Sequence, residues 1–358
     1  MKAFITASGV ISPQETHSGE GFPDSIRDIP GKRLSCLEPD YRALINPIQL
    51  RRMPRILRMG LASAQLCINR AGGINPDAII VGTGLGCLEN LEKFLTEVLT
   101  ENEHITSVLP FINSTHNAVA AQVAMLLQNH GYNVTYCHRG FSFESALDDA
   151  LMHLEEGAAQ DILAGGIDEC TDDFVKLHGY LNYWKEPVSN LSLLEDRSTG
   201  TIAGEGSAFF MLSAEPAGPF PVALNGVHTF FTPDGSGWQD VVPEIDRFLD
   251  AQGTDKKDLS LLLAGLNGDA GFDTIYFDLM NQYFGEGTGL GYYKHLCGEY
   301  YTSTSFALWL ASVILEKQHI PPMVEVSPTQ ETELRNILIY NHIRHHEHAL
   351  ILLSHGKV

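Results

Sequence analysis

The stretch NVTYCHRGFSFESALDDALMHLEEGAAQDILAGGIDE, residues 133–169, decides the fold. It opens with a short β-branched run, places Cys137 directly after that run, and continues with apolar residues at helical spacing. A second apolar run then ends in glycines. A strand, a helix and a second strand in this order predict part of a parallel or mixed sheet covered by helices. The apolar positions of the predicted helix are Phe143, Ala146, Leu147, Ala150, Leu151 and Leu154.

The same alternation of apolar runs and helical patterns appears on both sides of this stretch. It predicts an α/β chain whose two parts have similar size. Residues 214–240 lie between these parts and are rich in Pro and Gly, which is typical of a connector or a hairpin. The predicted strands are 77–82, 134–137, 161–168, 259–264 and 348–354, and the predicted helices are 88–100, 118–131, 142–154, 272–284 and 302–318.

The composition excludes several classes of function. The 358 residues have a formal net charge of −21, which disfavours binding to nucleic acid or to anionic membranes. No stretch has the length of a membrane span, and the N-terminus lacks a signal-peptide core, so we expect a cytoplasmic protein. The six cysteines form no CxxC pair and are expected to be free thiols, several of them buried: Cys36, Cys67, Cys87, Cys137, Cys170 and Cys297.

Cys137 is the first candidate for chemistry. At the start of a helix, unpaired N–H groups favour a thiolate, and His138 and Arg139 would add positive charge. The negative charge of Glu144 would have the opposite effect and raise the pKa of the thiol. The glycines of VGTGLG, residues 81–86, miss the dinucleotide-binding spacing because Cys87 stands where the third glycine belongs, so we interpret them as a tight turn.

Two further clusters have alternative interpretations. The segment NHIRHHEH, residues 341–348, contains four histidines, which would suit a transition metal or a polar loop or an interface. We favour no metal, because no other ligands are apparent. Four arginines, Arg51, Arg52, Arg55 and Arg58, are concentrated in an otherwise acidic chain. They form either a solvated helix face or a docking patch for an acidic partner.

Taken together, five segments resemble the β-ketoacyl synthase family. Residues 133–169 resemble the family's nucleophile region, in which a strand, a cysteine and a helix precede an AGG-acidic signature. The order of the segments matches the family over almost the whole chain. The other four are RRMPRILRMGLASAQLCINRAG (51–72), VGTGLG (81–86), DRSTGTIAGEGSAFFML (196–212) and KHLCGEYYTSTSFALWLASVILEKQHIPP (294–322).

The resemblance implies a thiolase-like fold, a five-layer α-β-α-β-α sandwich of two related halves, here expected at residues 1–213 and 214–358. It implies a dimer and no cofactor. It also implies a mechanism in which a cysteine takes an acyl group from acyl-carrier protein as a thioester. Two histidines then assist decarboxylation of a malonyl unit, whose carbanion attacks that thioester.

The family's catalytic positions are only partly kept. Cys137 matches the nucleophile and Lys294 matches the family's lysine. Asn267 and Glu299 stand where the resemblance places the two histidines, and NHIRHHEH replaces the glycine-rich GFGG loop. An ionised Glu299 would oppose the negative charge that develops on a malonyl thioester.

Arg51 and Arg52 match a basic position with which the family meets its acidic carrier protein. The resemblance therefore predicts acyl-carrier protein, an acyl thioester and a homodimeric or heterodimeric ketosynthase subunit as partners. The leading hypothesis is a subunit that resembles a chain-length factor, although such factors usually lack the cysteine. The alternatives are a Cys137-dependent acyltransferase with a non-standard site and a non-catalytic binding protein on the same fold.

Overall fold

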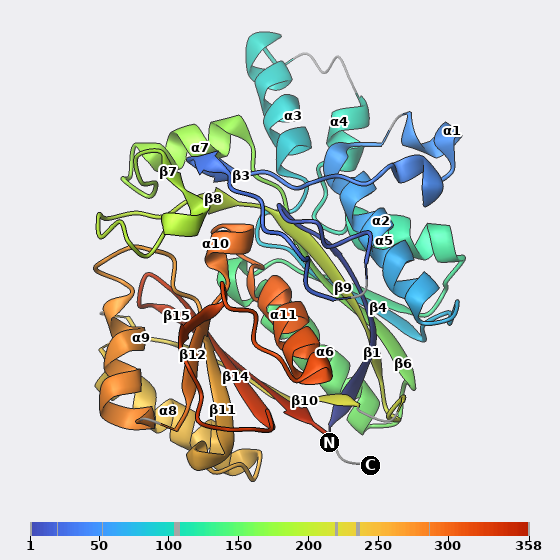
Figure 1. Cartoon of the computed structure of the whole chain (residues 1–358). Coiled ribbons are helices and arrows are strands. Elements are labelled where there is room, and N and C mark those ends of the chain that lie inside the picture. Colours follow the sequence, from blue (N-terminus) through green and yellow to red (C-terminus); the bar gives the residue numbers. More distant parts are fainter. Residues whose placement is uncertain are drawn as a thin grey trace.

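The computed structural model describes residues 2–19, 21–51, 53–103, 108–218, 221–233, 237–285 and 287–356. Within these ranges one sheet of eleven strands runs through the molecule (Figure 1). Its first five strands along the chain are β1 (Ala3–Ile11), β4 (Ala78–Gly82), β5 (Tyr132–Tyr136), β6 (Asp161–Asp168) and β9 (Gly206–Ser213). The other six are β10 (Val222–Phe231), β11 (Leu259–Ala264), β12 (Gly289–Tyr292), β13 (Glu325–Ser327), β14 (Asn336–Ile343) and β15 (Glu347–His355).

The two halves of the sheet repeat one topology. From its edge inward, the first half has the order β5-β4-β6-β9-β1, and the second half has β12-β11-β14-β15-β10 with β13 added outside β12. In each half the three outermost of these five strands are parallel, and the remaining neighbours are antiparallel. The halves meet where β1 pairs antiparallel with β10, with Phe4 opposite Ala223. The division of the chain at residues 213 and 214 stays a prediction.

Helices form three further layers. α6 (Ser142–Glu155) and α11 (Thr304–Lys317) lie in the middle and contact both halves of the sheet. α2 (Arg55–Arg70) and α5 (Ala118–Leu127) cover the outer face of the first half, and α8 (Trp238–Ala251) and α9 (Thr274–Leu279) cover the second (Figure 1). This arrangement confirms the thiolase-like α-β-α-β-α sandwich. The remaining described helices are α1 (Pro47–Leu50), α3 (Leu88–Thr100), α4 (Val108–Asn113), α7 (Asp172–Gly179) and α10 (Lys294–Cys297).

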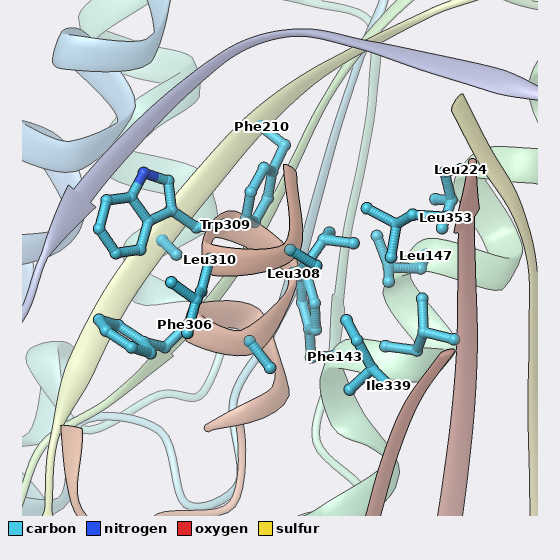
Figure 2. Close-up of a cluster of buried hydrophobic side chains, with 14 of the residues drawn as sticks. Phe143, Leu147, Phe210, Leu224, Phe306, Leu308, Trp309, Leu310, Ile339 and Leu353 are labelled. Carbon is cyan, nitrogen blue, oxygen red and sulfur yellow. The ribbon is translucent and has the colours of Figure 1, made fainter. Parts of the chain in front are cut away.

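The strands have an apolar side chain on both faces because each half-sheet lies between two helical layers. In β9, Phe210 faces the middle layer while Phe209 and Met211 pack against the outer helices. α11 is buried on all sides from Thr304 to Leu315, as expected for a helix in the central layer. Figure 2 shows the core that α11 forms with α6, β9, β10, β14 and β15.

Two short pairs of strands lie outside the main sheet. β2 (Pro30–Gly31) pairs with β7 (Val188–Ser189), and β3 (Arg33–Leu34) pairs with β8 (Ala203–Gly204). Of the helices that the structure describes, none combines the length and the apolar character that crossing a bilayer requires.

Two sequence predictions need correction. Residues 222–231 are not part of a connector or hairpin, because they form the central strand β10. The helix predicted over 118–131 ends at Leu127, since Gln128 takes a left-handed conformation with φ of 51°. The other predicted strands and helices are present, and the ends of α3, β6 and β11 are those predicted. The helix predicted over 272–284 consists of α9 followed by a π-helical turn, Met280–Phe284.

Candidate active site

The loop that carries Cys137 is fixed at both ends. The Ser142 hydroxyl accepts a hydrogen bond from the His138 N–H (2.8 Å) and donates one to the Arg139 carbonyl (2.7 Å). Gly140 donates its N–H to Glu347 Oε2 at 3.1 Å. A Cβ on Gly140 would meet the ends of the Ile343 and Glu347 side chains, which would have to move, so the glycine allows the β14–β15 hairpin to pack closely here. The loop therefore joins the two halves of the fold.

The Cys137 thiol is exposed, and it donates a hydrogen bond to the Gly84 carbonyl at a distance of 3.4 Å. Desolvation and the nearby charge of Asp168 raise the pKa of Cys137 above its ordinary value. The prediction that this site favours the thiolate is therefore wrong, because the pKa of the thiol is raised and not lowered. The carboxylate that raises it is Asp168 and not Glu144. Among the described residues, no histidine is hydrogen bonded to this thiol, so no general base is in place.

Asp168 fastens the predicted glycine turn to the start of α11. Its Oδ1 accepts from the Gly84 N–H (2.8 Å) and from Thr83 Oγ1 (3.1 Å). Its Oδ2 accepts from the N–H and the hydroxyl of Thr302, both at 2.9 Å. The residue belongs to the AGG-acidic signature, yet the sequence alone did not assign it a place in the site. These four hydrogen bonds hold the turn that carries Gly84 against the second half of the fold.

Asn267, Lys294 and Glu299 come together in one network. Lys294 Nζ lies 2.7 Å from both carboxylate oxygens of Glu299, and Asn267 Nδ2 donates to Glu299 Oε2 at 2.8 Å. The Lys294 side chain is fully buried, whereas 18% of the Glu299 side chain is exposed. The Asn267 Oδ1 accepts from the Asp269 N–H, which fixes the orientation of the amide.

The polar groups of this network already bind one another. Both carboxylate oxygens of Glu299 are hydrogen bonded to Lys294, and one N–H of the Asn267 amide is donated to Glu299. A thioester carbonyl bound here would develop its negative charge beside a carboxylate rather than beside a neutral imidazole. The geometry favours structural stabilisation over decarboxylation.

The carboxyl of Asp273, which is buried and has a raised pKa, lies next to the network. Asp273 accepts hydrogen bonds from the N–H groups of Asn267 (3.0 Å) and Gly268 (2.8 Å). Desolvation nevertheless raises the pKa of Asp273 to about 7, so this carboxyl is partly protonated at neutral pH. It shapes the loop after β11 without facing the thiol.

A cavity of about 510 Å³ opens above the network, and Cys137 does not line it. Leu85 and Tyr301 do line it, and Tyr301 also packs against Gly84, whose added Cβ would lie 2.4 Å from Tyr301 Cβ. The structure thus joins Asn267 and Glu299 in one cavity and leaves the predicted nucleophile outside it. Aromatic side chains form a large part of its lining: Phe174, His178, Tyr183, Trp184, Phe272, Tyr300, Tyr301 and His342.

The histidine segment forms the tip of the β14–β15 hairpin instead of a polar loop. His342 and His348 are buried, and burial lowers the pKa of His342 well below its usual range and that of His348 to about 4. His342 and His345 both direct a ring nitrogen at the Phe272 carbonyl, 3.1 and 2.9 Å away. In the described part of the chain, no group of three or more metal-ligating side chains is arranged to hold an ion.

Only part of the arginine cluster is available for docking. Arg55 pairs with Glu38 and makes two hydrogen bonds to the buried Glu205, and Arg58 donates to the Met53 carbonyl. These two arginines have structural partners. Arg51 follows α1 and is exposed, while Arg52 lies outside the described residues.

The comparisons with known proteins agree with this architecture. Residues 24–217 match the profile of the β-ketoacyl synthase N-terminal domain, which is more than half of the chain. This chain belongs to the β-ketoacyl synthase family. No curated protein matches it by sequence.

Solved structures share the fold at low identity. The chain is similar to one from the ishigamide ketosynthase/chain length factor, with a TM-score of 0.78, 16% identity and coverage of 99% of this chain and 98% of that one. The chain is also similar to one from the structure of the ketosynthase ApeO in complex with its chain length factor ApeC from Xenorhabdus doucetiae. The TM-score is 0.74 at 16% identity, and the match covers 99% of this chain and 98% of that one. A β-ketoacyl synthase from Burkholderia phymatum STM815 is similar with a TM-score of 0.75 at 13% identity, and the match covers 99% of each chain.

We expect Cys137 to be the most accessible thiol but a weak nucleophile near neutral pH. Alkylation by iodoacetamide, followed by mass spectrometry, should label Cys137 first, because the other cysteines are buried or half-buried. The labelling rate should still rise above pH 8.5, about the ordinary thiol pKa, since the folded site raises that pKa. Cys137→Ser supplies the control. A rate that levels off near pH 7 would contradict the described environment.

The Lys294–Glu299 pair should stabilise the fold only as a pair. Lys294→Met leaves the Glu299 charge without its buried partner, and we expect a loss of about 3 kcal/mol in the free energy of unfolding. Adding Glu299→Gln should recover at least half of that loss. Lys93→Met, at an exposed ion pair with Glu89, should cost less than about 1 kcal/mol. The measurement is urea unfolding. Equal losses in the free energy of unfolding for Lys294→Met and Lys93→Met would refute a stabilising role of the Lys294–Glu299 pair.

Proposed function

We propose that this member of the β-ketoacyl synthase family does not catalyse decarboxylative condensation itself and acts as a chain-length-factor-like partner of an active ketosynthase. The observation that carries the proposal is the closed network of Asn267, Lys294 and Glu299, located where the family resemblance places the catalytic histidines. The network offers no imidazole, and Cys137 does not line its cavity. The fold is kept, while the groups needed for malonyl decarboxylation are replaced.

The surface around β5 is suited to pairing with such a partner. β5 is the edge strand of the first half-sheet, so one side of its backbone has no sheet neighbour in the described structure. Met125 on α5 and Met152 on α6, the two helices that contact β5, are 70% and 49% exposed, and Tyr132 on the strand is 40% exposed. We name β5, Met125 and Met152 the edge surface. An apolar surface beside an unpaired strand favours association through the sheet edge.

The structural neighbours support the same proposal. Two of the similar structures contain a ketosynthase together with a chain length factor. A third contains a ketosynthase and a type II acyl-carrier protein; the chain similar to ours gives a TM-score of 0.72 at 13% identity. We therefore propose acyl-carrier protein and a ketosynthase subunit as the partners of this chain.

Co-expression with ketosynthases that keep the cysteine and both histidines should yield a stable heterodimer. Met125→Glu combined with Met152→Glu should weaken it at least tenfold, because two charges would be buried at the edge surface. Leu177→Glu, at an exposed apolar residue of α7, is the matched control. Light scattering and an elongation assay provide the readouts. A strict homodimer that condenses malonyl units unaided would refute the proposal.

A second candidate rests on the exposed Cys137. An acyltransferase needs the nucleophile more than the malonyl-binding histidines, so the chain would accept an acyl group on Cys137 without decarboxylation. The two candidates differ in the effect of Cys137→Ala. Elongation by the heterodimer should persist in this variant if the chain acts as a partner subunit, and acylation seen by intact mass should disappear if it is an acyltransferase.

We also propose that Arg51 and Arg52 contact the acidic carrier protein. Arg51→Glu combined with Arg52→Glu should weaken carrier-protein binding about three- to tenfold at low salt, with a smaller effect at high salt because salt screens the attraction between the two proteins. Arg247→Glu, at an exposed arginine of α8, is the control. An unchanged dissociation constant at low salt, measured by titration calorimetry, would rule out this docking site.

A further inference from the structure

The aromatic cavity has the features of a small-molecule site that is separate from the thiol. Its volume of about 510 Å³ lies within the range of roughly 300–1,000 Å³ that ligand pockets occupy. Cys137 does not line it, so the chemistry of a Cys137 thioester does not explain it. Binding of a small molecule in this cavity goes beyond the proposed function and does not depend on it.

The walls favour a flat, apolar ligand. On one side, Tyr183 and Trp184 lie after α7, with ring centroids 5.9 Å apart, and His178 packs edge-on against Tyr183 at 5.0 Å. On the other side, Phe272 comes from the loop after β11 and is held by an edge contact with His345 at 5.1 Å. Rings fixed by their neighbours in this way offer faces for stacking at little cost in side-chain entropy.

Arg344 connects the two walls. It stands at the hairpin tip with φ of 52°, and its guanidinium lies 4.5 Å from the ring centre of Tyr183 and 5.4 Å from that of Phe272. Within the described ranges it makes no ion pair or hydrogen bond through its side chain, although the chain carries many more acidic than basic residues. Stacking restrains the guanidinium while its N–H groups stay available in the plane, which is the geometry that binds a carboxylate through two hydrogen bonds.

The rest of the charged lining has the opposite sign, since Asp168, Glu169, Asp269 and Glu299 all line the cavity. Glu299 retains 18% exposure, and both carboxylate oxygens of Asp269 are engaged by backbone N–H groups. Lys294 is fully buried and does not line the cavity. An anionic group is thus attracted beside Arg344 and disfavoured beside the carboxylates, which fixes the direction of a ligand with one charged end.

From this arrangement we infer that the cavity binds a small planar aromatic carboxylate, whose carboxylate pairs with Arg344 and whose ring packs against Trp184, beside the guanidinium that Tyr183 and Phe272 hold in place. The uncharged end points toward Glu299. Trp184 lines the same cavity and is a natural reporter, because a stacked conjugated ligand should quench its fluorescence.

Four probes test the chemistry. Cinnamate should quench the fluorescence and show saturable binding in calorimetry. Cinnamyl alcohol, which lacks the carboxylate, and hexanoate, which lacks the ring, should each bind at least tenfold more weakly. 4-Carboxycinnamate should also bind at least tenfold more weakly, since its second carboxylate would face Glu299. Equal affinity for cinnamate and cinnamyl alcohol, or no binding of cinnamate, would overturn the inference.

Variants test the residues. Arg344→Gln should weaken cinnamate binding at least tenfold, and Arg344→Lys should restore only part of it because the ammonium cannot stack or form two parallel hydrogen bonds. Arg247→Gln, at an exposed arginine of α8, should change nothing. Trp184→Phe should abolish the quenching while calorimetry still detects binding. An Arg344→Gln protein that is folded by circular dichroism and keeps its full affinity would refute the role of Arg344. Heterodimer formation is measured separately and reports on the proposed function alone.

Discussion

The whole architecture depends on burying α11 on every side. From Thr304 to Leu315 this helix has no face that can meet water, and its few polar side chains find partners inside the protein. A single sheet would cover one face only, so both half-sheets are needed around the central layer. The contact between the Thr304 hydroxyl and Glu144 of α6 joins the two central helices. The thiol loop, the Asp168 turn and the network around Glu299 are all attached to this layer or to its ends.

The same constraint explains why the scaffold and the chemistry are separable in this chain. Asp168 holds the turn near Cys137 through four hydrogen bonds that need no catalytic histidine. Lys294 and Glu299 satisfy each other where imidazoles would otherwise be required. Each replacement keeps the buried polar groups paired, so the fold does not require imidazoles at these positions.

The sequence predicted the elements whose periodicity is strong, including α6, α11 and β4. The family resemblance singled out Asn267, Lys294 and Glu299, and the structure brings these three residues into one hydrogen-bonded network. Prediction from the sequence failed at β10, where prolines and glycines around residues 214–240 concealed a strand stabilised by two long-range neighbours. It also missed the cavity. Tyr183, Phe272 and Arg344 belong to three distant segments, and no local pattern connects them before the chain folds.

The position of β1 has a consequence for the order of folding. This strand is the first of the described strands along the chain, yet both of its neighbours in the sheet lie beyond residue 205, in β9 and β10. An apolar strand must therefore wait for more than half of the chain before its backbone can pair. Contacts of such sequence separation slow folding and expose the nascent chain to aggregation. The pairs at the centre of the finished sheet thus join segments that lie far apart in the chain.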